Sequence, residues 1–215
     1  WKKSLYIAVI RLLAGLASVR VVHDPSYCET YQARYLPHPL YVDELTQRPR
    51  ETGQSNESFK AGVLGALRPY KRLEHLIDAW PDGVNLLIRG RADQAYANLL
   101  QERIERRQLA KHVALQTGFM SREEFDREIA KLDAIILPHA DESALVSGAF
   151  FEAIGATPFV IARGSPFTKW AASKFQGIYT FENEQQLAAA IKSAQRLCSK
   201  SNDILEYNAK LANEL

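Results

Sequence analysis

Cysteine is scarce in this sequence, and none of its hydrophobic runs is long. The 215 residues include two cysteines, Cys28 and Cys198, which are too few for a disulfide scaffold and too far apart for a zinc knuckle. The longest apolar run, from Ser4 to Ala17, is shorter than the roughly 20 residues of a membrane-spanning helix and contains Arg11. No signal peptide is recognisable. We therefore expect a reduced, cytoplasmic setting.

Net charge and the common catalytic motifs are missing as well. The 27 Lys and Arg residues nearly balance the 25 Asp and Glu residues, which argues against nucleic acid as a partner. The five histidines do not have the spacing of metal ligands, and there is no HExxH motif. The sequence also lacks a GxSxG elbow, a P-loop and a GxGxxG fingerprint. These absences exclude several classes of hydrolase, NTPase and dehydrogenase.

What remains is a globular composition, with 47% hydrophobic and 24% charged residues. The length fits one domain, or one domain with a piece of another. The chain opens at Trp1 rather than Met, so we expect a fragment of a longer protein. Residues 2–17 predict a helix and residues 19–23 a strand, whereas residues 47–58 are almost purely polar and indicate a linker or an exposed loop.

After this linker, short apolar runs alternate with amphipathic helical patterns. Strands that are apolar throughout and separated by helices indicate a parallel sheet covered on both faces. We therefore predict an α/β fold, a Rossmann-like doubly wound parallel sheet of about six strands, whose ligands bind at the carboxyl ends of the strands. The expected strands lie at residues 63–65, 84–88, 113–115, 134–137, 159–162 and 178–181, and helices are expected near residues 73–80, 99–104, 121–132, 148–154 and 187–197.

The first turn from strand to helix, residues 65–71, brings two cations to the expected ligand edge. Gly65 allows a close approach of the backbone, and Arg68 and Lys71 follow it. Two cations at a helix N-terminus oppose the positive end of the helix dipole, and an anion between them would relieve this conflict. A solvated Arg and Lys in an ordinary surface turn is an equally good interpretation from the spacing alone.

The segment from Pro138 to Ile154 contains a strand end, a polar loop and a helix start. The small residues Gly148 and Ala149 would let backbone amides face a phosphate, and the Ser147 hydroxyl adds a donor. Glu152 follows about one and a half turns later and could accept hydrogen bonds from a ribose diol. The alternatives are an ordinary N-cap for Ser147 and a charge that complements the helix dipole for Glu152.

A third turn, residues 117–121, follows the third expected strand. Ser121 and Glu124 have the spacing of a capping box. The apolar pair Phe119 and Met120 beside this helix start could form a slot for a flat base. Two core residues that happen to be uncovered would give the same pattern.

Taken in order, five segments make the chain resemble the C-terminal, nucleotide-sugar-binding domain of GT-B glycosyltransferases, the large group 1 family of mostly retaining enzymes. The resemblance covers about half of the chain. It implies residues 1–45 as a remnant of an N-terminal acceptor domain, 46–58 as a linker and 59–215 as the donor-binding domain. The carrying segments are Gly65…Arg68…Lys71 with Leu76-Ile77-x-Ala79, Leu87-Ile88-x-Gly90, Gly118-Phe119-Met120-Ser121, residues 133–138, and Ser147-Gly148 with residues 158–161.

The resemblance also implies residue roles. Lys71 would contact the donor diphosphate, and Arg68 would replace by reach an arginine that many relatives carry where this chain has Ala66. Glu152 would hold the ribose, while the first glutamate of the family pair is replaced by Ala144. The Ser147-Gly148-Ala149 turn is similar to that of some bacterial polysaccharide-assembly relatives. Gly65, Met120, Ser147, Gly148, Ala149 and Glu152 are thus the expected binding residues, with Lys71 and Arg68 as the catalytic cations.

The implied reaction is transfer of a sugar from a nucleoside-diphosphate sugar to a glycan or lipid-linked acceptor, in cell-surface polysaccharide synthesis. The resemblance implies no metal cofactor, and the lack of a DxD-type pair near a strand end agrees with this. Peripheral association with the inner face of the membrane would come from the missing N-terminal part. The 215 residues alone are expected to have little activity. A sugar-nucleotide epimerase and a non-catalytic nucleotide-binding subunit are the alternatives.

Overall fold

A computed structural model describes residues 2–23, 28–36, 58–139 and 148–214, and the chain divides into two compact units, Trp1–His38 and Pro39–Leu215. The expected boundary at residue 45 and all of the expected linker except Ser58 fall outside the described residues. The two units are therefore treated one at a time.

The smaller unit contains two helices and one pair of short strands: α1 (Lys2–Leu16), β1 (Val21–Val22), α2 (Cys28–Tyr31) and β2 (Arg34–Tyr35). The strands pair in parallel, with Val21 opposite Arg34. The Arg20 side chain donates hydrogen bonds to the backbone oxygens of Ala14, at 2.8 Å, and Tyr31, at 3.2 Å. The predicted helix is thus confirmed, and the predicted strand is shorter than expected.

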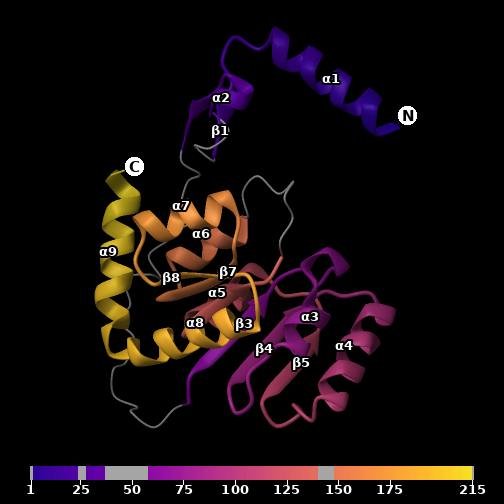
Figure 1. The fold of residues 1–215 in the computed structure, drawn as a ribbon, viewed down its shortest axis with the longest axis vertical. Helices are drawn as coiled ribbons and strands as arrows, with labels where there is room; N and C mark the ends of the chain where they lie inside the picture. The colour runs from indigo at the N-terminus through magenta and orange to yellow at the C-terminus, as the bar shows by residue number, and fades with distance from the viewer. Residues whose placement is uncertain (1, 24–27, 37–57, 140–147, 215) are drawn as a thin grey trace. The chain divides into compact units, whose positions relative to one another are not determined.

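The larger unit is built on one sheet of six parallel strands (Figure 1). The strands lie in the order β5-β4-β3-β6-β7-β8, so the chain starts in the middle of the sheet, builds outward to β5 and then returns to the other side of β3. This confirms the predicted doubly wound sheet. The strands are β3 (Lys60–Leu64), β4 (Asn85–Gly90), β5 (Val113–Thr117), β6 (Ala134–Leu137), β7 (Phe159–Arg163) and β8 (Ile178–Phe181).

Helices cover both faces of this sheet, and each face has its own apolar cluster (Figure 1). Helices α3 (Leu73–Asp78), α4 (Gln94–Arg106) and α8 (Glu184–Arg196) bury their apolar side chains against one face. Helices α5 (Arg122–Ala130), α6 (Gly148–Ile154) and α7 (Pro166–Lys174) do so against the other. Because both faces are covered, β6 is buried along its whole length, as its uninterrupted apolar sequence predicts.

Two helices of this unit were not among the predicted elements. One is α7, which begins with a capping box between Ser165 and Thr168 and has Pro166 in its first turn. The other is α9 (Ser201–Glu214), which follows a short 3₁₀ turn, η4 (Cys198–Lys200). Ile204 of α9 belongs to the cluster under α8, whereas Leu211 packs against the cluster on the opposite face. Helix α9 therefore contributes to both layers.

The order of the strands fixes where a ligand site can lie. Strands β3 and β6 are neighbours and pair in parallel, with Ala61 opposite Ala134. The chain leaves these two strands in opposite directions, so the loops that follow them diverge and leave a crevice at the carboxyl edge of the sheet. Most of the predicted site residues lie in the loops after β3 and β6 and in the first turns of α6, and Met120 lies in the loop after β5.

Candidate functional site

The loop after β3 holds its cations by a defined backbone path. Gly65 has a φ of 97°, a left-handed conformation that glycine adopts without strain. A short 3₁₀ turn, η3 (Pro69–Lys71), follows and ends at Arg72, which has a φ of 52°. Helix α3 starts immediately afterwards at Leu73. Arg68 is exposed on this loop and Lys71 is half-buried.

Arg68 and Lys71 are not paired with a counter-charge on any described part of the chain. Neither Arg68 nor Lys71 forms an ion pair or hydrogen bond through its side chain with any residue that the structure describes. Burial lowers the pKa of the Lys71 ammonium below its usual value of 10.5, because the charged form is partly removed from water. A bound anion would relieve this cost, so Lys71 is suited to hold one.

Backbone hydrogen bonds join this loop to the loops after β4 and β5. The Leu67 amide donates to the carbonyl of Arg91 at 2.9 Å, and the Gly118 amide donates to the carbonyl of Gly90 at 3.0 Å. Gly90 is required here, since a Cβ at this position would collide with the backbone oxygen of Gly65. Three successive loops are thus fixed side by side at the carboxyl edge of the sheet.

On the other side of the crevice, the end of β6 contacts the same loop. The rings of Tyr70 and His139 pack edge to face, with 6.2 Å between their centroids and an angle of 88°. The loop after β3 and the loop after β6 therefore lie at one common edge. Residues 140–147 are outside the described residues, and with them the predicted phosphate-binding hydroxyl of Ser147.

Helix α6 begins at Gly148, as predicted, with Gly148 exposed and Ala149 half-buried. Glu152, the predicted ribose ligand, forms an ion pair: its Oε1 accepts a hydrogen bond from Nη1 of Arg122 at 2.8 Å. This pair links α6 to the first residue of α5. The carboxylate keeps its second oxygen, and 25% of its side chain is exposed.

Arg122 is itself held in place by neighbours on α5. Its Nε lies 3.0 Å from Oδ1 of Asp126, and its guanidinium carbon lies 5.7 Å from the centre of the Phe125 ring. The capping box predicted at the start of α5 is confirmed, because the Ser121 hydroxyl accepts from the Glu124 amide and the Glu124 carboxylate accepts from the Ser121 amide. The sequence analysis missed Arg122, and no motif in the sequence marks it as a partner of Glu152.

The predicted slot for a base lies beside this capped helix. Met120 is half-buried and packs against the apolar cluster under α5 and α6, so it is partly a core residue. Phe119, by contrast, is 81% exposed. Such an exposed aromatic ring provides one flat apolar face next to the turn that begins at Gly118.

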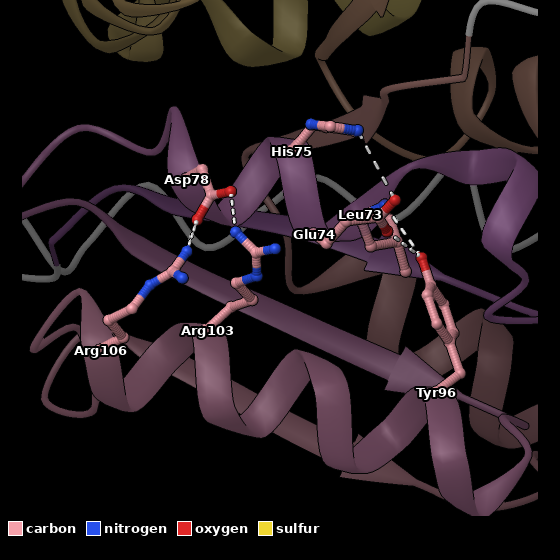
Figure 2. A network of polar contacts seen from close by, with 7 residues as sticks. All are labelled: Leu73, Glu74, His75, Asp78, Tyr96, Arg103 and Arg106. Atoms are coloured by element: carbon pink, nitrogen blue, oxygen red, sulfur yellow. Dashed lines mark hydrogen bonds and ion pairs between the residues drawn. The ribbon is translucent and has the colours of Figure 1, made fainter.

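Helix α3, which follows the cationic loop, is fixed to α4 by a polar network (Figure 2). The Tyr96 hydroxyl accepts a hydrogen bond from the Leu73 amide at 3.1 Å and donates one to Glu74 Oε2 at 2.7 Å. At the other end of α3, the Asp78 carboxylate pairs with Arg103 at 2.7 Å and with Arg106 at 3.3 Å. The position of the loop that ends at Arg72 is therefore supported from outside the loop.

These interactions form a ring of contacts around the candidate site. The loop between β3 and α3 is hydrogen-bonded to the loop after β4, which in turn is hydrogen-bonded to the loop after β5. Arg122 joins α5 to α6, and His139 at the end of β6 packs against Tyr70 of the first loop. Arg68, Lys71, Glu152 and the exposed ring of Phe119 all belong to loops or helices that begin at this edge. The arrangement suits a ligand with an anionic group, hydroxyls and a flat ring. Within the described ranges, no three His, Cys, Asp or Glu residues cluster closely enough to hold a metal ion. None of the described helices has the length and apolar character needed to cross a membrane.

The comparison with protein families gives one match: the model described as "Glycosyl transferases group 1" covers residues 46–211. No curated protein matches the chain. Many solved structures do, with high probability but low sequence identity.

Among these structures is HepE from Anabaena in complex with UDP, with a TM-score of 0.71 and 18% identity over 92% of this chain and 59% of HepE. Sucrose-phosphate synthase from Thermosynechococcus elongatus has a TM-score of 0.71 and 16% identity over 93% of this chain and 54% of its own. The C-terminal domain of the group 1 glycosyl transferase LpcC from Francisella tularensis has a TM-score of 0.53 and 20% identity, over 73% of this chain and 85% of the LpcC domain. The chain thus spans little more than half of HepE and of the synthase, and the likeness is one of fold.

Proposed function

The chain belongs to the group 1 glycosyl transferases, and from this premise we propose that it binds a nucleoside-diphosphate sugar whose sugar is transferred to a glycan or lipid-linked acceptor. The observation that supports this most is the ring of contacts around the carboxyl edge of β3 and β6. The elements that carry Arg68, Lys71 and Glu152 belong to this ring of contacts, and neither cation has a counter-charge among the residues that the structure describes.

Each part of the donor has a matching group in this proposal. Lys71 and Arg68 face the diphosphate, and Gly65, Gly148 and Ala149 let the backbone approach it, together with Ser147. The carboxylate of Glu152 accepts hydrogen bonds from the ribose diol. The turn at Gly118, with Phe119 and Met120, receives the base. HepE was solved with UDP bound, which makes UDP the first nucleotide to test.

The chemistry follows from the charge that builds up on the leaving diphosphate as the anomeric bond breaks. A cation that is already desolvated stabilises that charge more strongly than one in bulk water, and it needs no rearrangement during the reaction. Lys71 has this character because it is half-buried, while Arg68 adds a second charge from the exposed side. We place the reaction in cell-surface polysaccharide assembly, because the sequence Ser147-Gly148-Ala149 is similar to that of some bacterial polysaccharide-assembly relatives, and in the cytoplasm, because the chain has only two cysteines.

The test is a calorimetric titration of the chain with UDP and, in parallel, with GDP. The double variant Arg68→Ala with Lys71→Ala is expected to bind UDP at least tenfold more weakly, which corresponds to about 1.4 kcal/mol. A matched control, Lys174→Ala with Arg196→Ala, removes two exposed cations from the ends of α7 and α8 and should leave the affinity unchanged.

Equal affinities of the double variant and the wild type would refute the assigned roles. Incubation of UDP-glucose with the protein separates the proposal from an epimerase, because an epimerase converts the sugar nucleotide in the absence of an acceptor.

A further inference from the structure

A cavity of 420 Å³ lies between α3 and the start of α8, on the side of the sheet that these two helices cover. Its lining includes Pro138, Arg163 and Phe181, which lie at the carboxyl ends of β6, β7 and β8. Its volume is within the range of about 300–1,000 Å³ that is typical of small-molecule sites. None of the residues assigned above to the nucleotide-sugar lines it.

Two arginines that line this cavity have no counter-charge among the described residues. Arg72 contributes from the start of α3 and Arg163 from the end of β7. Neither forms an ion pair or side-chain hydrogen bond with any part of the chain that the structure describes. Arg163 is half-buried whereas Arg72 is exposed, and a charge that is partly removed from water gains more from an anionic partner than an exposed one.

The acidic groups around the cavity compensate these arginines only in part. Asp78 also lines the cavity, but Figure 2 shows its carboxylate directed at Arg103 and Arg106 of α4, at 2.7 and 3.3 Å, and away from His75. Its charge is therefore already balanced on the α4 side. Glu184 is the other carboxylate in the lining, and it forms no ion pair with the described residues, so the lining holds two guanidinium groups and one available carboxylate.

The backbone that carries both arginines is fixed before any ligand arrives. The Tyr96 hydroxyl binds the amide of Leu73, directly after Arg72 (Figure 2). The carbonyl of Arg163 accepts a hydrogen bond from the Thr168 hydroxyl at 3.0 Å. Binding there would order two side chains but would not reorganise the loops, so its entropic cost is low.

We propose that this cavity is a second ligand site, separate from the nucleotide site, for the phosphate ester of a sugar. The planar forks of Arg72 and Arg163 suit the oxygens of a phosphate monoester. His75, Asn183 and Glu184 line the same cavity and offer hydrogen-bonding groups to sugar hydroxyls. Leu76 and Ala79 supply the apolar surface on which a sugar ring packs.

The test uses glucose 6-phosphate as the probe, with UDP present at saturation so that the nucleotide site is occupied. Calorimetry should detect binding to the wild type, and Arg163→Gln should weaken it at least tenfold while the affinity for UDP changes less than twofold. The matched control Arg196→Gln removes an exposed arginine at the other end of α8 and should change neither affinity. Glucose and inorganic phosphate, tested alone, should each bind more weakly than the ester.

Amide chemical shifts place the bound probe. Perturbations at Asn183 and Phe181 are expected, whereas perturbations confined to Gly65 and Gly148 would mean that the probe occupies the nucleotide site, and would overturn the proposal. Absence of binding in the presence of UDP would overturn it too. If Arg163→Gln does not fold, Arg72→Asn replaces it, because asparagine tolerates the left-handed backbone at this position.

Whether glucose 6-phosphate binds in this cavity does not depend on whether the chain binds the proposed nucleotide-sugar donor. If UDP itself fails to bind, the proposed function fails, and the titration with glucose 6-phosphate still decides whether the second site exists.

Discussion

The partly buried ammonium of Lys71 affects both the stability of the fold and the proposed binding of an anion. Its burial lowers the pKa of the ammonium, so the folded chain holds this proton less tightly than the unfolded chain does. Between the lowered pKa and 10.5, the unfolded state binds more protons, and this residue's contribution to the free energy of unfolding therefore rises with pH. The affinity for an anion changes with pH in the opposite direction and falls as the pH rises, because only the protonated Lys71 ammonium attracts the anion.

We therefore predict that the affinity for UDP falls as the pH rises from 7 toward 10.5. The phosphates are almost fully ionised above about pH 7 and contribute little to this change, and the comparison is confined to pH values below the ionisation of the uracil N3–H, which would itself weaken binding. Lys71→Arg should abolish the decline, since arginine stays protonated over the whole range. Calorimetric titrations at a series of pH values measure both. An affinity of the wild type that is constant with pH would show that Lys71 does not contact the diphosphate.

Arg122 acts on the proposed site through another residue. Its guanidinium binds one oxygen of Glu152 and leaves the other for a ligand, while Asp126 holds the guanidinium from behind. Arg122→Gln should thus let the Glu152 carboxylate rotate and lose its orientation. We expect this variant to bind UDP roughly tenfold more weakly, a loss of about 1.4 kcal/mol.

The same variant should bind 2′,3′-dideoxy-UDP as well as the wild type does, because that nucleotide has no diol for Glu152 to hold. This comparison separates orientation of Glu152 from a general loss of structure, which would weaken both ligands alike. Arg127→Gln, a change of an exposed arginine on the same helix, serves as the control. Equal losses for the two nucleotides would contradict the positioning role.

At the scale of elements, α3 is unusual in how its first turn is capped. Its N-cap position is Arg72, whose side chain makes no capping hydrogen bond. Instead, the Tyr96 hydroxyl of α4 accepts a hydrogen bond from the Leu73 amide and donates one to the carboxylate of Glu74 (Figure 2). A neighbouring helix thus supplies the acceptor that a Ser or Asp would normally provide.

Tyr96→Phe should therefore destabilise the larger unit by about 1–3 kcal/mol, because the buried Leu73 amide loses its acceptor. Urea unfolding followed by circular dichroism measures the change. Tyr207→Phe is the matched control: this tyrosine is 44% exposed and makes no hydrogen bond to the described residues. A loss below about 0.5 kcal/mol would mean that water replaces the hydroxyl at this helix start.

The secondary-structure elements that were predicted correctly are those whose sequence pattern depends on residues close together in the chain. The apolar strands and the capping box of Ser121 and Glu124 are set by neighbours within a few residues, and both were predicted and confirmed. Helix α7 was missed because Pro166 and a weak apolar pattern give it the look of a loop. Helix α9 was missed because its apolar side chains divide between two layers rather than forming one stripe.

The elements that carry the candidate site divide in the same way. The loop with Arg68 and Lys71 and the start of α6 follow from strand ends and small residues, which a single sequence displays. The partners across the crevice do not: Arg122 and Glu152 are 30 residues apart, and Tyr70 and His139 come from different loops. Such pairings depend on the order of strands in the sheet, which local patterns do not contain.

At the scale of the larger unit, α9 links the two layers that the sheet separates. Ile204 packs with the cluster under α8, and Leu211 packs with the cluster under α6 and α7. Between them, the side chain of Asn208 is almost fully buried and makes two hydrogen bonds of 2.9 Å to the backbone of Gln176, just before β8. We expect the two layers to unfold together, because one helix is part of both.

Asn208→Ala tests this coupling. It removes two part-buried hydrogen bonds to the backbone of Gln176, so the free energy of unfolding should fall by about 1–3 kcal/mol. Fluorine NMR of 5-fluorotryptophan reports each layer, since Trp80 is buried on one face and Trp170 packs on the other. Both signals should show one common urea midpoint, and the variant should lower that midpoint equally for both, while Asn202→Ala on the same helix leaves it unchanged. A shift of the Trp170 signal without the Trp80 signal would show instead that α9 stabilises one layer alone.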